Sequence, residues 1–194
     1  RVFIMDEAKE LLPPYLRFVK GVIDAEDLPL NVSREILQEN RVLAAIKKHV
    51  VKKVIDHLGK MKTTKADDYA TVWGEFGAVL KEGLLPGTQG KDRILDLVLA
   101  HSTADGGQQT SIADYVERLG DEHESIYYIT APSIEAARRS PHLEAFRDRG
   151  IEVLVFTDRV DEMWLSSIGE YKDKKFQSVG HGEVDLGDSK AEGD

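Results

Sequence analysis

The sequence predicts an α/β protein in which a helical region precedes a small βαβ domain. Apolar residues recur at three- and four-residue spacing or its multiples from Ile36 to Leu58, which indicates a long helix with one apolar stripe. Strand-like and helical patterns alternate between residues 111 and 179, which indicates a βαβ unit. Residues 102–111 are rich in glycine and polar side chains, so they predict a flexible linker at a domain boundary.

The first region begins with a short apolar run, Val2 to Met5, which predicts a buried strand. A helical stretch from Glu7 to Val19 follows, and Pro13 and Pro14 interrupt it. An acidic loop, residues 24–31, then leads into the long helix. Two shorter helices are predicted after it, from Asp67 to Lys81 and from Asp92 to Ala100. The first of them should turn one apolar stripe inward, made of Tyr69, Val72, Trp73, Phe76, Val79 and Leu80.

The second region combines capped helices with apolar strands. Ser111, in a capping-box pattern with Asp114, and Ser133 are the expected N-caps, and Gly150 is an expected helix stop. The resulting helices are 111–119, 133–139, 141–150 and 160–168, and the strands are 125–130, 151–157 and 174–179. The strand at 151–157 is almost continuously apolar, as in a parallel sheet buried on both faces. The acidic, glycine-rich tail from Gly180 predicts a disordered segment or a linker.

Composition excludes several classes of function. The formal net charge of −9 argues against non-specific nucleic-acid binding. The absence of cysteine excludes disulfides, thiol catalysis and cysteine-bound zinc, and it fits a reducing cytosol. No apolar run approaches the roughly 20 residues that a membrane span needs. Because the sequence opens on an apolar run without an initiator methionine or a signal-peptide pattern, we expect it to be cut from a larger protein.

An arginine stands where a helix N-terminus usually disfavours a cation. Asn31 or Ser33 can cap the long helix, which places Arg34 in its first turn among free backbone N–H groups that favour anions. The guanidinium suits phosphate oxygens, and Gln38 lies one turn further on the same face. The alternative is a surface ion pair with an acidic neighbour, which spacing alone favours because such pairs are common. The possible partners are Glu26, Asp27 and Glu35.

A second candidate site lies in residues 160–171. Met163 and Trp164 stand beside the acidic Glu162, and adaptable or aromatic side chains with a charged rim suit a protein-binding surface. On this interpretation both side chains are at least partly exposed. The alternative, in which Trp164 and Ile168, one turn apart, face the core, is slightly favoured by the pattern alone.

Other patterns predict no chemistry of their own. His49 and His57 lie two turns apart with no convergent partner, so no metal site is predicted. Residues 87–91 lack the spacing of a phosphate loop. The basic residues of the long helix are interpreted as its solvated face. These are Arg41, Lys47, Lys48, Lys52 and Lys53.

The sequence resembles the middle domain of the heat-shock-protein-90 chaperones, of the bacterial HtpG type. The likeness is dense over residues 1–43, which include the motif LNVSRE at 30–35, and it resumes over 114–162 and 174–179. Residues 72–83 match more loosely. The resemblance thus runs from Arg1 to about residue 179.

The resemblance implies part of a cytoplasmic, homodimeric, ATP-driven chaperone that acts on unfolded client proteins. ATP with Mg would bind mainly to an N-terminal domain, and a C-terminal domain would form the main dimer contact; on this resemblance we expect both to lie outside the sequence. The fragment alone would then hold no cofactor and no metal, catalyse nothing by itself, and bind neither nucleic acid nor membrane. The implied parts are the end of a large αβα subdomain with a catalytic loop (1–32), a helical connector (33–104), a small αβα subdomain (105–179) and a flexible tail (180–194).

The resemblance also assigns roles to candidate residues. Arg34 would reach the γ-phosphate of ATP in the closed state, and Gln38 would support the same catalytic site. Glu162, Met163 and Trp164 would belong to a client-binding surface, although Met163 here stands between the acidic and the aromatic residue. The rival interpretation is a non-catalytic protein-interaction scaffold in which Arg34 makes only a structural ion pair. A more distant rival is a free-standing small α/β enzyme.

Overall fold

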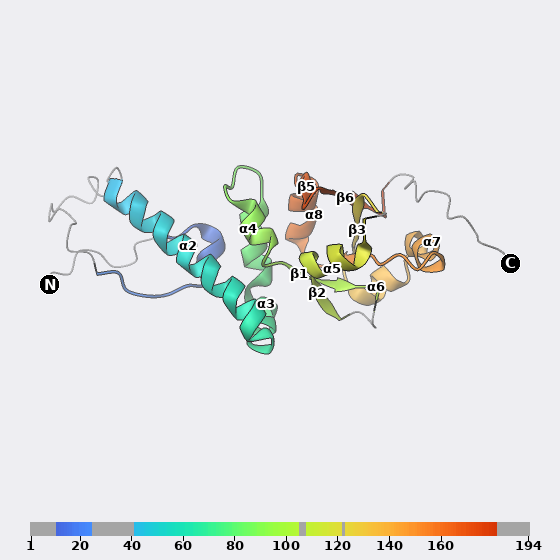
Figure 1. Ribbon diagram of the computed structural model, residues 1–194, viewed down its shortest axis with the longest axis horizontal. Helices are drawn as coiled ribbons and strands as arrows, with labels where there is room; N and C mark the ends of the chain where they lie inside the picture. Colours follow the sequence, from blue (N-terminus) through green and yellow to red (C-terminus); the bar gives the residue numbers. More distant parts are fainter. Residues whose placement is uncertain (1–10, 25–40, 105–107, 122, 182–194) are drawn as a thin grey trace. The chain divides into compact units, whose positions relative to one another are not determined.

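The computed structural model describes residues 11–24, 41–104, 108–121 and 123–181 (Figure 1). The chain divides into two compact units, residues 1–83 and 84–194. The first unit contains helices, and the second contains a six-stranded sheet with helices, so the predicted α/β class is confirmed.

The first unit is built on two helices, α2 (Arg41–Thr64) and α3 (Ala66–Lys81). Helix α2 packs against α3, and α3 also contacts the short 3-10 helix η2 (Pro14–Leu16). Apolar side chains from all three elements are buried in this unit, which confirms the predicted inward stripe of α3 in part. They are Tyr15, Leu16, Ile55, Leu58, Tyr69, Trp73 and Leu80.

Two contacts hold the segment after η2 against α3. The Arg17 guanidinium donates to both carboxylate oxygens of Glu82, at 2.5 and 2.8 Å. These hydrogen bonds are the main reason that the pKa of Glu82 lies below its ordinary value. The ring of Phe18 stacks on that of Phe76 with 4.4 Å between centroids. Phe76 was predicted to face inward, but it lies at the surface of α3 with Phe18 as its cover.

The sheet of the second unit has the strand order β2-β1-β4-β3-β6-β5. Strand β3 runs parallel to both β4 and β6, and the other pairs are antiparallel. The strands are β1 (Leu99–Ser102), β2 (Gln109–Ser111), β3 (Ser125–Thr130), β4 (Leu154–Phe156), β5 (Glu170–Tyr171) and β6 (Lys174–Ser178). The parallel pair β3–β4 confirms the predicted βαβ unit, and all three residues of β4 are buried.

Helices precede the first strand and connect several of the others. They are α4 (Lys91–Leu95), α5 (Ile112–Leu119), α6 (Ile134–Arg138), α7 (Glu144–Asp148) and α8 (Arg159–Leu165), with the 3-10 turns η3 (Glu82–Leu84) and η4 (Pro141–Leu143). The predicted N-caps are confirmed, because Ser111 accepts the Asp114 N–H at 3.1 Å and Ser133 accepts the Ala136 N–H at 3.1 Å. Gly150 has φ +67°, a conformation that favours glycine and ends α7 as predicted.

One predicted helix is partly a strand. Helix α4 ends at Leu95, whereas the sequence predicted helix as far as Ala100. Side chains of β1 alternate between half-buried and buried, which is the period of a strand. Strand β1 is paired on both sides, with β2 and with β4, and this pairing overrides the helical propensity of its leucine and alanine.

The glycine-rich segment 102–111 lies within the second unit. Strands β1 and β2 pair on either side of it, with Leu99 opposite Ser111 and His101 opposite Gln109. The first compact unit ends at Gly83. Residues 105–107 of the predicted flexible linker, and residues 182–194 of the tail predicted to be disordered from Gly180, lie outside the described residues.

Candidate functional site

The two sequence-predicted sites differ in what the structure shows of them. Arg34 and Gln38 lie outside the described residues. Glu162, Met163 and Trp164 lie on α8, which follows the buried strand β4 directly. The geometry of the candidate site is therefore the geometry of this helix.

A capping box begins α8. Asp158 is the N-cap with extended backbone, and its backbone N–H donates to the Asp161 carboxylate at 2.9 Å. Asp161 is the third helical residue, the position from which an acidic side chain reaches back to the N-cap. The cap fixes where the helix starts, and hence which of its side chains face the sheet.

The inner face of α8 carries a buried carboxylate. Asp161 has no exposed surface, and its second carboxylate oxygen accepts the indole N–H of Trp164 at 2.8 Å. Both oxygens are thus hydrogen-bonded, which offsets the cost of burying the charged group. The carboxylate therefore orients the tryptophan as well as capping the helix.

Trp164 is part of an aromatic cluster in the core. It is fully buried and meets the rings of Phe156 and Phe176 edge to face, with centroid distances of 5.4 and 5.8 Å. The prediction that Trp164 is partly exposed was wrong, and the core alternative holds for this side chain. The spacing of Asp161, Trp164 and Leu165, all buried, is the i, i+3, i+4 pattern that could have shown this.

The outer face of α8 presents the other two residues. Met163 is 59% exposed, which confirms its predicted exposure, and Glu162 beside it is exposed as well. The Ser166 hydroxyl donates to the Met163 carbonyl at 2.9 Å near the helix end. The structure thus places the Met163 thioether and the Glu162 carboxylate at the surface, whereas the side chain of Trp164 is buried.

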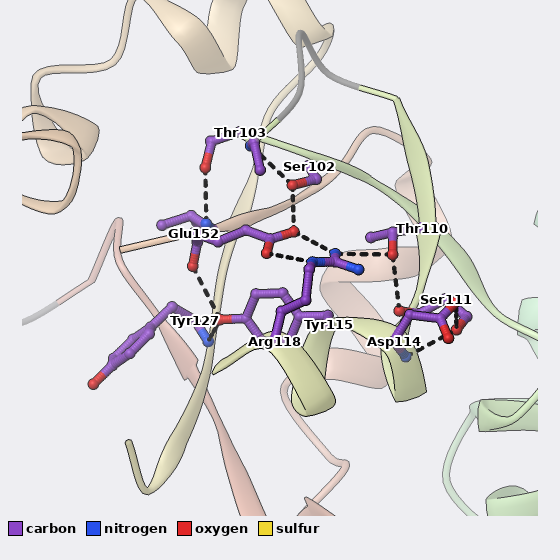
Figure 2. A network of polar contacts seen from close by, with 11 residues as sticks. Ser102, Thr103, Thr110, Ser111, Asp114, Tyr115, Arg118, Tyr127 and Glu152 are labelled. Carbon is purple, nitrogen blue, oxygen red and sulfur yellow. Dashed lines mark hydrogen bonds and ion pairs between the residues drawn. The ribbon is translucent and has the colours of Figure 1, made fainter. Parts of the chain in front are cut away.

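A polar network centred on Glu152 was not predicted from the sequence (Figure 2). Its carboxylate accepts from the Ser102 hydroxyl at 2.5 Å and from Arg118 at 2.7 and 3.0 Å. Arg118 also donates to the Thr110 hydroxyl at 3.0 Å. Because these partners are 34 to 50 residues from Glu152 in sequence, no local pattern marks them.

Tyr115 extends the network into the core. Its hydroxyl donates to the Glu152 carbonyl at 3.0 Å and accepts the Tyr127 N–H at 3.1 Å (Figure 2). Burial raises the pKa of Tyr115 above its ordinary value, so the hydroxyl keeps the proton it donates. The network joins β1, β2, α5 and β3 to Glu152, which lies two residues before β4.

We expect Glu152→Ala to lower the free energy of unfolding by about 1–3 kcal/mol, because it removes charge-assisted hydrogen bonds to Ser102 and Arg118. Urea denaturation measures the loss. The matched control is Glu117→Ala, an exposed glutamate on the same unit, which should change stability by at most about 0.5 kcal/mol. Equal losses in the two variants would show that the network contributes nothing specific.

The described residues contain no group of three or more histidine, aspartate or glutamate side chains placed to hold a metal ion. His49 and His57 instead border an open apolar groove of about 360 Å³ on α2, next to Val50 and Val54. None of the described helices combines the length and the apolar character required to cross a membrane.

Comparison with known proteins identifies the family. The family model described as Hsp90 protein matches residues 1–194, the whole chain. The chain belongs to the Hsp90 family. It is 51% identical over 192 residues to the chaperone protein HtpG of Streptomyces coelicolor, covering 99% of this chain and 30% of that protein. It is 54% identical over 188 residues to HtpG of Bordetella parapertussis, with 96% and 30% covered.

This Hsp90-family chain spans about 30% of the length of the HtpG proteins it matches. The chain is also 53% identical over 188 residues to HtpG of Magnetococcus marinus, and it covers 29% of that protein. The family model includes residues 30–35, the LNVSRE motif that holds Arg34.

Proposed function

We propose that this chain is the middle segment of an ATP-dependent chaperone and that it supplies Arg34 to the γ-phosphate of ATP. The observation that supports this most is the Hsp90-family match over residues 1–194, which includes the LNVSRE motif. HtpG relatives extend well beyond the length of this chain, which leaves room for a nucleotide-binding domain and a dimerisation domain elsewhere. On this proposal, the full-length protein is a cytoplasmic homodimer that uses ATP with Mg.

The proposed role of Arg34 follows from its chemistry. A phosphoryl transfer reaction spreads negative charge over the γ-phosphate oxygens, and a planar, permanently charged guanidinium can donate two parallel hydrogen bonds to them. Gln38, one turn further along, would orient the same region with its neutral amide. The segment resembles an arginine finger in this respect, because the pocket that binds ATP lies in another domain.

The rival function is a non-catalytic interaction scaffold in which Arg34 pairs with a neighbouring acid. ATP turnover by the full-length Arg34→Ala protein separates the two, since a scaffold predicts no catalytic loss. A free-standing enzyme would instead show turnover by the 194-residue chain alone.

We also propose that the outer face of α8 contacts client proteins. Met163 supplies an exposed, adaptable apolar side chain, and Glu162 supplies the polar rim that such surfaces commonly have. The buried Trp164 would be a positioning residue. Its hydrogen bond to Asp161 and its packing on Phe156 hold α8 in place, and with it the exposed side chains of Glu162 and Met163.

We expect Met163→Gln to weaken the binding of an unfolded client by the full-length protein about threefold to tenfold, because a polar amide replaces an apolar contact of similar length. Fluorescence anisotropy with labelled, reduced and carboxymethylated α-lactalbumin measures the affinity. The stability of the variant should change little, since Met163 is exposed. The matched control is Met61→Gln on α2, for which we expect unchanged client binding. Equal affinities of the wild type and Met163→Gln would count against the proposed surface.

A further inference from the structure

All sulfur atoms of this chain belong to methionine side chains. The sequence has three methionines and no cysteine, so no thiol of the chain competes for a two-electron oxidant. Of the two methionines that the structure describes, Met163 is 59% exposed and Met61 is half-buried. Oxidation of a thioether depends on exposure, so Met163 is the more susceptible of the two.

The surroundings of Met163 allow modification without unfolding. The buried side of α8 is held by Trp164 and Leu165, while Met163 points to the opposite side. The Asp161 carboxylate, which completes the capping box and accepts from Trp164, is buried on the inner side of the helix. The Ser166 hydroxyl binds the backbone carbonyl of Met163 and leaves the side chain free to react.

We propose that Met163 is a reversible oxidation site that lowers client binding under peroxide stress, an inference that rests on the proposed client-binding role of α8. The Met163 sulfur attacks one oxygen of a peroxide, the O–O bond breaks, and an S–O bond forms. The sulfur loses two electrons, and hydrogen peroxide is reduced to water. A dithiol-dependent methionine sulfoxide reductase reverses the step: the sulfoxide oxygen leaves as water, and the dithiol becomes a disulfide.

The product changes the character of the surface. A sulfoxide is polar and accepts hydrogen bonds, whereas the thioether is apolar and polarisable. Next to the exposed Glu162, oxidation replaces an exposed apolar side chain of α8 with a polar one. We expect the affinity for an unfolded client to fall about threefold to tenfold, as for a glutamine at the same position.

The experiment uses the full-length protein containing this chain, with Met163→Leu and the matched control Met61→Leu. Each protein is treated with hydrogen peroxide and then with methionine sulfoxide reductase and dithiothreitol. Peptide mass spectrometry measures the oxidation rate at each methionine. Anisotropy with reduced, carboxymethylated α-lactalbumin measures client affinity before treatment, after oxidation and after reduction.

Met163 should oxidise faster than Met61, and peroxide should weaken client binding by the wild type and by Met61→Leu, with recovery on reduction. The client affinity of Met163→Leu should fall much less on peroxide treatment, relative to the affinity of the same variant before treatment. Equal losses in all three proteins, or slower oxidation of Met163 than of Met61, would overturn the proposal. The untreated Met163→Gln variant distinguishes a failure of the proposed client-binding role from a failure of the proposed oxidation switch. If it binds client as the wild type does, the client-binding role itself fails. If it binds weakly and Met163 resists peroxide, only the oxidation switch fails.

Discussion

Replacing Arg34 with alanine in the full-length chaperone is expected to lower ATP turnover by roughly one and a half to three decades, while ground-state ATP affinity stays nearly unchanged. The loss corresponds to about 2–4 kcal/mol, the usual cost of removing one charged donor from a dry site. The ATP pocket lies in another domain on our proposal, so most binding contacts survive the substitution. An interaction made only as the γ-phosphate is transferred raises the rate without tightening the ground state.

Two further variants test the chemistry of that contact. Arg34→Lys should restore turnover only in part, because an ammonium keeps the charge but loses the planar fork. Gln38→Ala should cost less than Arg34→Ala, since a neutral amide forms weaker hydrogen bonds than a charged donor.

Steady-state ATPase and nucleotide affinity should be measured on the same preparations, with circular dichroism to confirm the fold. A folded, dimeric Arg34→Ala protein with unchanged turnover would contradict the assignment and favour the scaffold. A parallel loss of ATP affinity and turnover would instead place Arg34 in ground-state binding.

Replacing Trp164 with alanine is expected to lower the free energy of unfolding of the second unit by about 3–5 kcal/mol, the range for truncating a fully buried tryptophan. The substitution removes the edge-to-face contacts with Phe156 and Phe176. It also deprives the buried Asp161 carboxylate of its indole donor, which adds a desolvation cost.

Denaturation in urea, followed by far-ultraviolet circular dichroism, measures this loss. Trp164→Phe should lose less, because it keeps an aromatic ring but not the indole N–H. Met163→Ala, one residue away on the exposed side of α8, is the matched control, and it should change stability by at most about 0.5 kcal/mol. A small loss at Trp164, similar to that at Met163, would mean that the aromatic cluster is not essential to the fold.

Local patterns predicted most of the second unit correctly. The strand at 125–130, the N-caps Ser111 and Ser133 and the stop at Gly150 all depend on nearby residues, and the structure has them. These features follow from backbone preferences and side-chain bonds within a few residues, so one sequence is enough to predict them.

The features that were not predicted from the sequence depend on contacts between residues that are distant along the chain. The first half of strand β1, Leu99 and Ala100, was predicted as helix, because the pairing of β1 with β2 and β4 is not visible in its composition. The Glu152 network was missed for the same reason, since its partner Ser102 lies 50 residues away. At the candidate site, the exposure of Met163 was predicted correctly and that of Trp164 was not, although the helical spacing of Asp161, Trp164 and Leu165 indicates a buried face. The roles of Arg34 and Gln38 stay predictions.

The place of β1 in the sheet decides where this chain can be divided. Strand β1 covers one side of β4, with His101 opposite Val155 and Ser102 opposite Leu154, although it precedes the βαβ unit in sequence. A protein that begins within the glycine-rich segment would lack β1. The wholly apolar strand β4 would then become an open edge of the sheet. Unpaired apolar edges are the surfaces through which sheets of separate molecules join and aggregate. The segment 102–111 therefore resembles an interdomain linker in composition, yet β1 and β2 pair with each other in one sheet, and β1 shields β4 from self-association.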